Sequence, residues 1–157
     1  MNHGETTMDP ILSNETEILI VGTYPSRISR RLDQYYGNPN NHFWKLMSHL
    51  LDVDIQEMDY NARIETLLQH KIGLWDTIGS CDITGSSDSS IRNEACNDFS
   101  HLGHVRKVIC NGKKAYECIE QCNVPENIEV VRVPSSSPAR AMRFEEKLAE
   151  WKEAFSL

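Results

Sequence analysis

The sequence lacks the patterns that identify several large classes of protein. No apolar run is long enough to span a membrane, and the N-terminus has no apolar secretory region. The GxGxxG and GxxxxGKS/T patterns of nucleotide binding are absent, as are HExxH and GxSxG. We therefore expect a cytoplasmic protein with no membrane association, and a monomer, whose chemistry follows none of these motifs.

Metal-binding patterns are also missing. The five cysteines are odd in number and contain no paired CxxC. Cys118 and Cys122 lie four residues apart on an expected helix, but no second pair completes a tetrahedral site, so reduced cysteines are the simpler interpretation. The six histidines show no metal-ligand spacing. We expect no metal, no redox cofactor and no iron–sulfur cluster.

Positive charge is scarce: 16 Lys and Arg stand against 23 Asp and Glu, for a formal net charge of -7. This balance counts against a nucleic-acid partner, because phosphate contacts need Lys and Arg. The distribution weakens the objection, since the acids concentrate in residues 52–57 and 145–153 while arginines flank two Pro/Ser-rich loops. The local field at a cleft matters more for binding than net charge does.

The length of 157 residues, with 39% hydrophobic and 25% charged residues, suits one globular domain over residues 1–157, in which 1–14 is a loosely ordered leader. Apolar periodicity predicts strands at 17–22, 71–78, 106–110 and 128–133. It predicts helices at 41–51, 60–70, 113–122 and from Ala139 onward. Residues 79–99 are polar and rich in turn formers, so we expect a long loop there. Short apolar strands separated by helices predict an α/β fold with a mostly parallel sheet covered on both faces.

Two strands end in loops rich in proline and serine, Tyr24-Pro25-Ser26 and 134–138. Such residues often mark turns only. In a parallel sheet, however, both loops lie at the same edge, where they can form opposite lips of one cleft. The first loop continues into a stretch with two tyrosines, three asparagines and nearby arginines. Aromatic faces, neutral amides and cations suit a flipped nucleobase beside phosphates better than a metal or a nucleoside triphosphate.

Several segments follow one another in the order of a known family. They are Gly22-Thr23-Tyr24-Pro25-Ser26, the run from Tyr36 to Lys45, Leu74-Trp75-Asp76, 85–91 with 97–99, 110–116 and 134–139. These segments resemble the uracil-DNA glycosylase superfamily, and in particular its hypoxanthine-DNA (deoxyinosine) glycosylase branch. Each match is weak alone, but their shared order over most of the chain is specific. The resemblance implies a three-layer α/β/α sandwich with a four-stranded, mostly parallel central sheet. It also implies hydrolysis of the N-glycosidic bond of a damaged base in DNA.

The resemblance also suggests roles for individual residues. Tyr36 matches the aromatic that stacks on the flipped base, although a core tyrosine is the alternative. Asn41 matches the asparagine that orients water or holds the base, with Asn38 as second candidate; a helix N-cap is the other interpretation of Asn41. The remaining expected contacts are base binding by Thr23, Tyr24 and Asn111, and DNA binding by Ser26, Ser135, Ser136, Ser137 and Arg140.

Two departures from the superfamily pattern narrow the expected chemistry. Many members carry Asp, Asn or Glu where this sequence has Thr23 and Tyr24, and the histidine that classical uracil enzymes have after the last strand is missing. An amide is no general base, so catalysis by Asn41 would depend on positioning and electrostatics. No lysine lies in the motifs to form a Schiff base, which implies a monofunctional enzyme.

The sequence therefore predicts a DNA glycosylase of base-excision repair that acts on DNA with a deaminated base, hypoxanthine first, with uracil or xanthine as further substrates. One alternative is a hydrolase of nucleosides or modified nucleotides on the same scaffold. Another is a binding module that recognises damaged DNA without catalysis.

Overall fold

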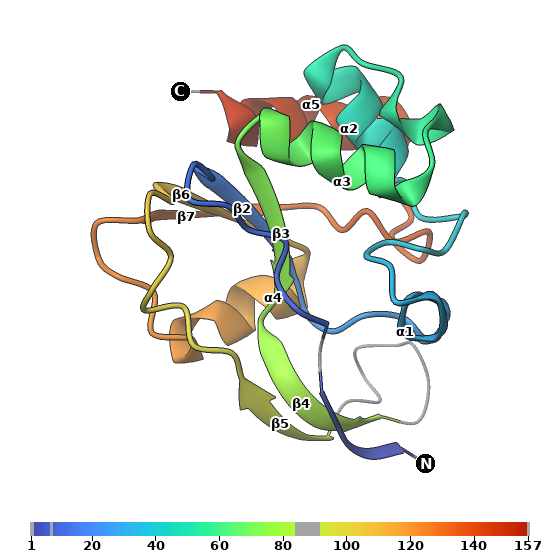
Figure 1. The fold of residues 1–157 in the computed structure, drawn as a ribbon. Coiled ribbons are helices and arrows are strands. Elements are labelled where there is room, and N and C mark those ends of the chain that lie inside the picture. The colour runs from blue at the N-terminus through green and yellow to red at the C-terminus, as the bar shows by residue number, and fades with distance from the viewer. Residues whose placement is uncertain (1, 7, 84–91, 157) are drawn as a thin grey trace.

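The central sheet has four parallel strands in the computed structural model, which describes residues 2–6, 8–83 and 92–156 (Figure 1). Its strands are β2 (Ile18–Gly22), β3 (Ile72–Asp76), β6 (Lys107–Asn111) and β7 (Glu129–Val133), in the order β3-β2-β6-β7. β2 lies inside the sheet and pairs in parallel with both β3 and β6. The predicted four-stranded parallel sheet is confirmed.

Helices cover both faces of this sheet, because successive side chains of a strand point to opposite sides. Ile20 of β2 belongs to the core beneath α2 (Phe43–Leu51), α3 (Tyr60–Gln69) and α5 (Phe144–Phe155), which lie together above the sheet in Figure 1. Leu19 and Val21 face the other way, into a second core that includes Ala115 of α4 (Lys113–Cys118). The predicted three-layer arrangement is confirmed. None of the helices in the described ranges is long and apolar enough to cross a membrane.

Some predicted boundaries were wrong. The last helix begins at Phe144 rather than Ala139, since the Ser/Pro-rich chain before it continues as turns. The helix expected over 113–122 is α-helical only to Cys118 and ends in the 3-10 segment η3 (Ile119–Gln121). The stretch after β2 contains a helix, α1 (Arg27–Leu32), that was not predicted because its sequence is rich in arginine. Ser26 is its N-cap and accepts a hydrogen bond from the Ser29 N–H. Another short 3-10 segment, η1 (Ile55–Glu57), follows α2.

A second, antiparallel sheet was not predicted. It consists of β1 (Asn2–Thr6), β4 (Ile78–Ile83) and β5 (Arg92–Cys96), in the order β1-β4-β5. β1 lies within the segment expected to be a loose leader, and β5 lies within the expected long loop. β4 begins at the last residue of the strand expected over 71–78 and continues into that loop. These strands carry many polar residues, so they lack the apolar signal on which strand prediction depends.

The loop after β7 is attached to the helical layer by Trp151 of α5. This side chain is fully buried, and its Nε1–H donates a 2.8 Å hydrogen bond to the carbonyl oxygen of Pro134. Trp75 offers a comparison: its ring stacks on Phe99, but its buried Nε1 has no hydrogen-bond partner in the described part of the chain. Trp151 therefore contributes both apolar burial and a polar anchor for the loop.

We expect Trp151→Phe to lower the free energy of unfolding by about 1–3 kcal/mol more than Trp75→Phe does, because only the former leaves a carbonyl unpaired. Urea denaturation of both variants measures this difference as a shift of the midpoint at constant m value. Equal losses in the two variants would show that the hydrogen bond to Pro134 adds nothing to stability.

Candidate functional site

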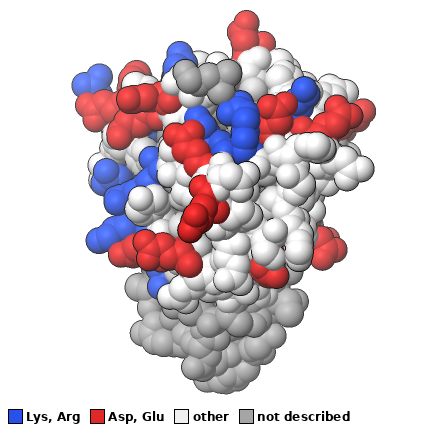
Figure 2. Space-filling view, turned by 90° about the vertical axis from the view of Figure 1, so that its left-hand side faces the viewer, with Lys and Arg blue, Asp and Glu red and all other residues white. Residues whose placement is uncertain are grey.

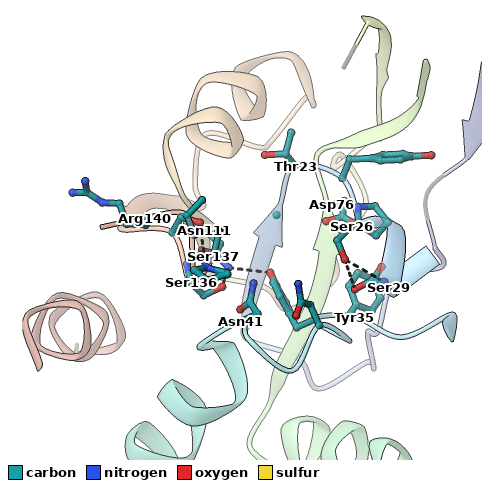
Figure 3. A pocket seen from close by; sticks show the side chains of 18 residues that line it. Thr23, Ser26, Ser29, Tyr35, Asn41, Asp76, Asn111, Ser136, Ser137 and Arg140 are labelled. Atoms are coloured by element: carbon teal, nitrogen blue, oxygen red, sulfur yellow. Dashed lines mark hydrogen bonds between the residues drawn. The ribbon is translucent and has the colours of Figure 1, made fainter. Parts of the chain in front are cut away.

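A cleft of about 620 Å³ lies at the carboxyl ends of the central strands. The last residues of β2, β3 and β6, which are Gly22, Asp76 and Asn111, all line it. The loops after β2 and β7 form its two lips, as the sequence predicted. Figure 3 shows Asn111, Ser136 and Arg140 on one side of the cleft and Asp76, Ser26 and Ser29 on the other.

Every residue proposed from the sequence for catalysis, base binding or DNA binding lines this cleft. They are Thr23, Tyr24, Ser26, Tyr36, Asn38, Asn41, Asn111, Ser135, Ser136, Ser137 and Arg140. Their roles stay predictions, but their common location follows from the fold. The matching segment 85–91 lies outside the described residues.

The first lip is held rigidly by local hydrogen bonds. The Ser26 hydroxyl accepts from the Ser29 N–H and donates to the Ser29 hydroxyl, each at 3.2 Å. The Ser29 hydroxyl in turn accepts a 2.9 Å bond from the Gly37 N–H. Thr23 and Tyr24 are both buried, and the Arg30 guanidinium lies 5.4 Å from the centre of the Tyr24 ring. Thr23 and Tyr24 therefore form part of the wall of the cleft, and base binding by them stays a prediction.

Tyr36 is fixed between the cleft and the core. Its backbone is left-handed (φ 53°), and its carbonyl accepts a 3.1 Å hydrogen bond from the indole N–H of Trp44. One face of the ring stacks on Phe43, with centroids 3.9 Å apart and planes at 13°. A base could stack only on the opposite face. Burial, and secondarily the negative charge of Asp76, raises the pKa of the Tyr36 phenol, so the hydroxyl stays protonated.

Asn41 combines a structural contact with a position in the cleft. Its Oδ1 accepts a 2.9 Å hydrogen bond from the N–H of Phe43, the first residue of α2. The N-cap position itself belongs to His42, so the predicted N-cap was displaced by one residue. Within the described part of the chain, the Nδ2 of Asn41 has no hydrogen-bond partner, which leaves this donor for a ligand. Asn40 is exposed and lies outside the cleft lining.

Asn111 joins three segments of the site. Its Nδ2 donates to the Tyr36 hydroxyl at 3.2 Å and to the Ser136 hydroxyl at 2.9 Å, and its Oδ1 accepts from the Ser136 N–H at 2.9 Å. Both N–H donors of the amide are thus engaged. Base binding by Asn111 stays a prediction; in this structure its amide connects Tyr36 to Ser136.

The second lip, which follows β7, is only partly accessible. Ser136 is 1% exposed and is held by Asn111, while its carbonyl accepts a 2.9 Å bond from the His42 N–H. Ser135 and Ser137 are half-buried, and their hydroxyls accept hydrogen bonds from backbone N–H groups two residues further on. Arg140 is exposed at the rim. Contacts with phosphates would fall mainly to Ser135, Ser137 and Arg140.

Three further residues with polar side chains line the cleft and were not proposed from the sequence: Ser29, Tyr35 and Asp76. Asp76 is 4% exposed and is the only carboxylate among the described residues that line the cleft. Its one signal in the sequence is its place in Leu74-Trp75-Asp76. No group of three or more His, Cys, Asp or Glu with a metal-binding arrangement occurs among the residues that the structure describes.

Comparisons with known proteins agree with this architecture. The family model of the uracil DNA glycosylase superfamily matches residues 10–156. The chain is 40% identical to a protein named hypoxanthine DNA glycosylase from Methanosarcina acetivorans over 149 residues, which cover 92% of this chain and 94% of that one. It is 37% identical over 150 residues to a protein of the same name from Methanosarcina barkeri, covering 93% and 94%.

A solved structure shows the same fold. The solution NMR structure of a candidate uracil DNA glycosylase from Methanosarcina acetivorans superimposes with a TM-score of 0.82 at 37% identity, covering 96% of this chain and 94% of the other. Identity of this level over nearly the full length, together with the family match, leaves one assignment: the chain belongs to the uracil DNA glycosylase superfamily.

Proposed function

We propose that this protein is a monofunctional DNA glycosylase that hydrolyses the N-glycosidic bond of hypoxanthine in DNA. The observation that carries the proposal is the cleft itself, in which neutral amides and a stacked tyrosine converge in a chain related to proteins named hypoxanthine DNA glycosylase. Hypoxanthine presents a carbonyl acceptor and an N–H donor on one edge. Asn41 carries a donor with no partner in the described protein, which suits such an edge. We further propose that the protein acts as a cytoplasmic monomer.

The positions of the lysines in the described part of the chain support hydrolysis without a Schiff-base intermediate between enzyme and DNA. A Schiff base requires a lysine at the reacting carbon. No lysine is among the described residues that line the cleft. Lys147 is fully buried nearby, but its Nζ lies 3.2 Å from the His42 Nδ1 and outside the cleft lining. We therefore expect removal of the base without cleavage of the DNA strand.

A second cleft provides a path for the DNA backbone. It has a volume of about 720 Å³ and shares Asn111, Ser135 and Arg140 with the first. Lys113, Lys114 and Arg132 also line it, together with the acidic Glu117 and Glu150. Figure 2 shows that basic side chains gather in groups on the molecular surface, with acidic ones between them. The cations beside the first cleft favour DNA over a free nucleoside as substrate.

The first test is excision from labelled duplexes that carry hypoxanthine, uracil, xanthine or only normal bases, followed by alkali. We expect cleavage at hypoxanthine and a decrease of about 100-fold to 1,000-fold in Asn41→Ala, as for the loss of one preorganised donor. Asn40→Ala is the matched control and should retain full activity. No excision by the wild-type protein from any duplex would refute the proposal, and release of hypoxanthine from free deoxyinosine alone would favour the nucleoside hydrolase.

The second test measures how DNA affinity depends on salt. If Lys113 and Arg132 each neutralise one phosphate, Lys113→Ala with Arg132→Ala should reduce the slope of log affinity against log salt by about 2. Undamaged and hypoxanthine-containing duplexes should lose affinity to a similar degree. Lys71→Ala serves as control, because Lys71 pairs with Glu17 before the start of β3, away from the carboxyl ends of the strands. An unchanged slope in the double variant would exclude this path.

A further inference from the structure

Asp76 holds a carboxylate in a cleft whose other polar groups are almost all neutral. Among the described residues that line the cleft, the single other charged side chain is Arg140, exposed on the opposite side (Figure 3). A buried carboxylate is costly unless the surrounding structure compensates it. Such groups are candidates for catalysis when they face a ligand cleft.

The position of the carboxylate is set by the central sheet. Asp76 is paired with Gly22 in the parallel register of β3 and β2, and its carbonyl accepts a 2.8 Å hydrogen bond from the Asn97 Nδ2. A Cβ atom on Gly22 would lie 2.9 Å from the Asp76 Oδ1 and 3.4 Å from the Tyr36 hydroxyl. The carboxylate therefore extends over the end of β2 toward Tyr36, the residue expected to stack on the base. Glycine at position 22 leaves the space that this approach requires.

Among the described residues that line the cleft, Asp76 carries the one carboxylate, and the other ionisable groups are poor proton acceptors. Burial first, and then the charge of Asp76, raises the pKa of the phenols of both Tyr35 and Tyr36, so these hydroxyls remain neutral at working pH. Arg140 and Arg30 are cations and cannot accept a proton. The amides of Asn41 and Asn111 cannot act as general bases. A carboxylate can accept a proton, which the side chains of Thr23 and Tyr24 do not readily do at neutral pH.

We propose that Asp76 is the catalytic residue that activates the water in the glycosylase reaction, a role that rests on the function proposed above. The water oxygen forms a bond to C1′ of the deoxyribose as the bond from C1′ to the base nitrogen breaks, and the electron pair leaves with the base. One water proton passes to the Asp76 carboxylate and then to solvent, and the departing base takes up a proton from solvent. The negative carboxylate also stabilises the positive charge that develops on the sugar.

Asp76→Asn tests this role, because it removes the charge at nearly constant volume. We expect the single-turnover rate on the hypoxanthine duplex to fall by about 100-fold to 10,000-fold, while the affinity for that duplex changes only a few-fold. Asp33→Asn is the matched control, since Asp33 is exposed and lies outside the cleft.

Chemical rescue separates a catalytic role from a structural one. Formate should increase the rate of Asp76→Ala with formate concentration and should leave Asn41→Ala unchanged. A purely structural role predicts no rescue, and a lowered melting temperature would account for the lost activity. If the wild type is active, two results would each overturn the role of Asp76 without affecting the proposed function. One is full activity of Asp76→Asn, and the other is the absence of formate rescue in a folded Asp76→Ala. Inactive wild type on every duplex would instead refute the proposed function.

Discussion

The side-chain amide of Asn111 connects the segments on which the cleft depends. It lies at the end of β6 and binds Ser136 of the loop after β7 through two hydrogen bonds, and Tyr36 of the loop before α2 through a third. These partners are distant in sequence, so their arrangement is determined only when the sheet has formed. Because Asn111 and Ser136 are both buried, breaking this network would leave polar groups without water or partners. The network thus connects β6, the loop after β7 and the loop before α2.

Further contacts hold the same loop from the helical side. The His42 N–H donates to the Ser136 carbonyl, and Trp151 donates to the Pro134 carbonyl. Lys147 approaches the His42 ring, and burial followed by the charges of Lys147 and Lys45 lowers the pKa of His42, which favours its neutral form. The loop after β7 is therefore attached to the sheet and to both α2 and α5. Such rigidity suits catalysis that depends on positioned dipoles, since little reorganisation is needed when charge develops.

The sequence predicted the parts of this architecture that local patterns encode. The four central strands and α2, α3 and α5 have periodic apolar residues, and the shared edge of a parallel sheet places both Pro/Ser loops together. The polar strands β4 and β5 and the arginine-rich α1 escaped detection because their stability comes from pairing and capping rather than apolar spacing. Asp76 and the hydrogen bonds of Asn111 were hidden for another reason. The location of Asp76 beside Tyr36 and the hydrogen bonds of Asn111 depend on strand register and on contacts between residues far apart in the sequence, which no short segment of sequence contains.

The net charge of -7 bears on how the protein would contact DNA. An acidic protein gains little attraction for undamaged DNA, so contacts with phosphates must come from local cations beside the cleft. Apart from the carboxylate of Asp76, the interior of the cleft instead offers amides, hydroxyls and aromatic rings, and contacts of these neutral groups with a base would depend little on salt. A base that pairs poorly is extruded at lower cost than a well-paired one, and this difference contributes to selectivity before any base contact forms.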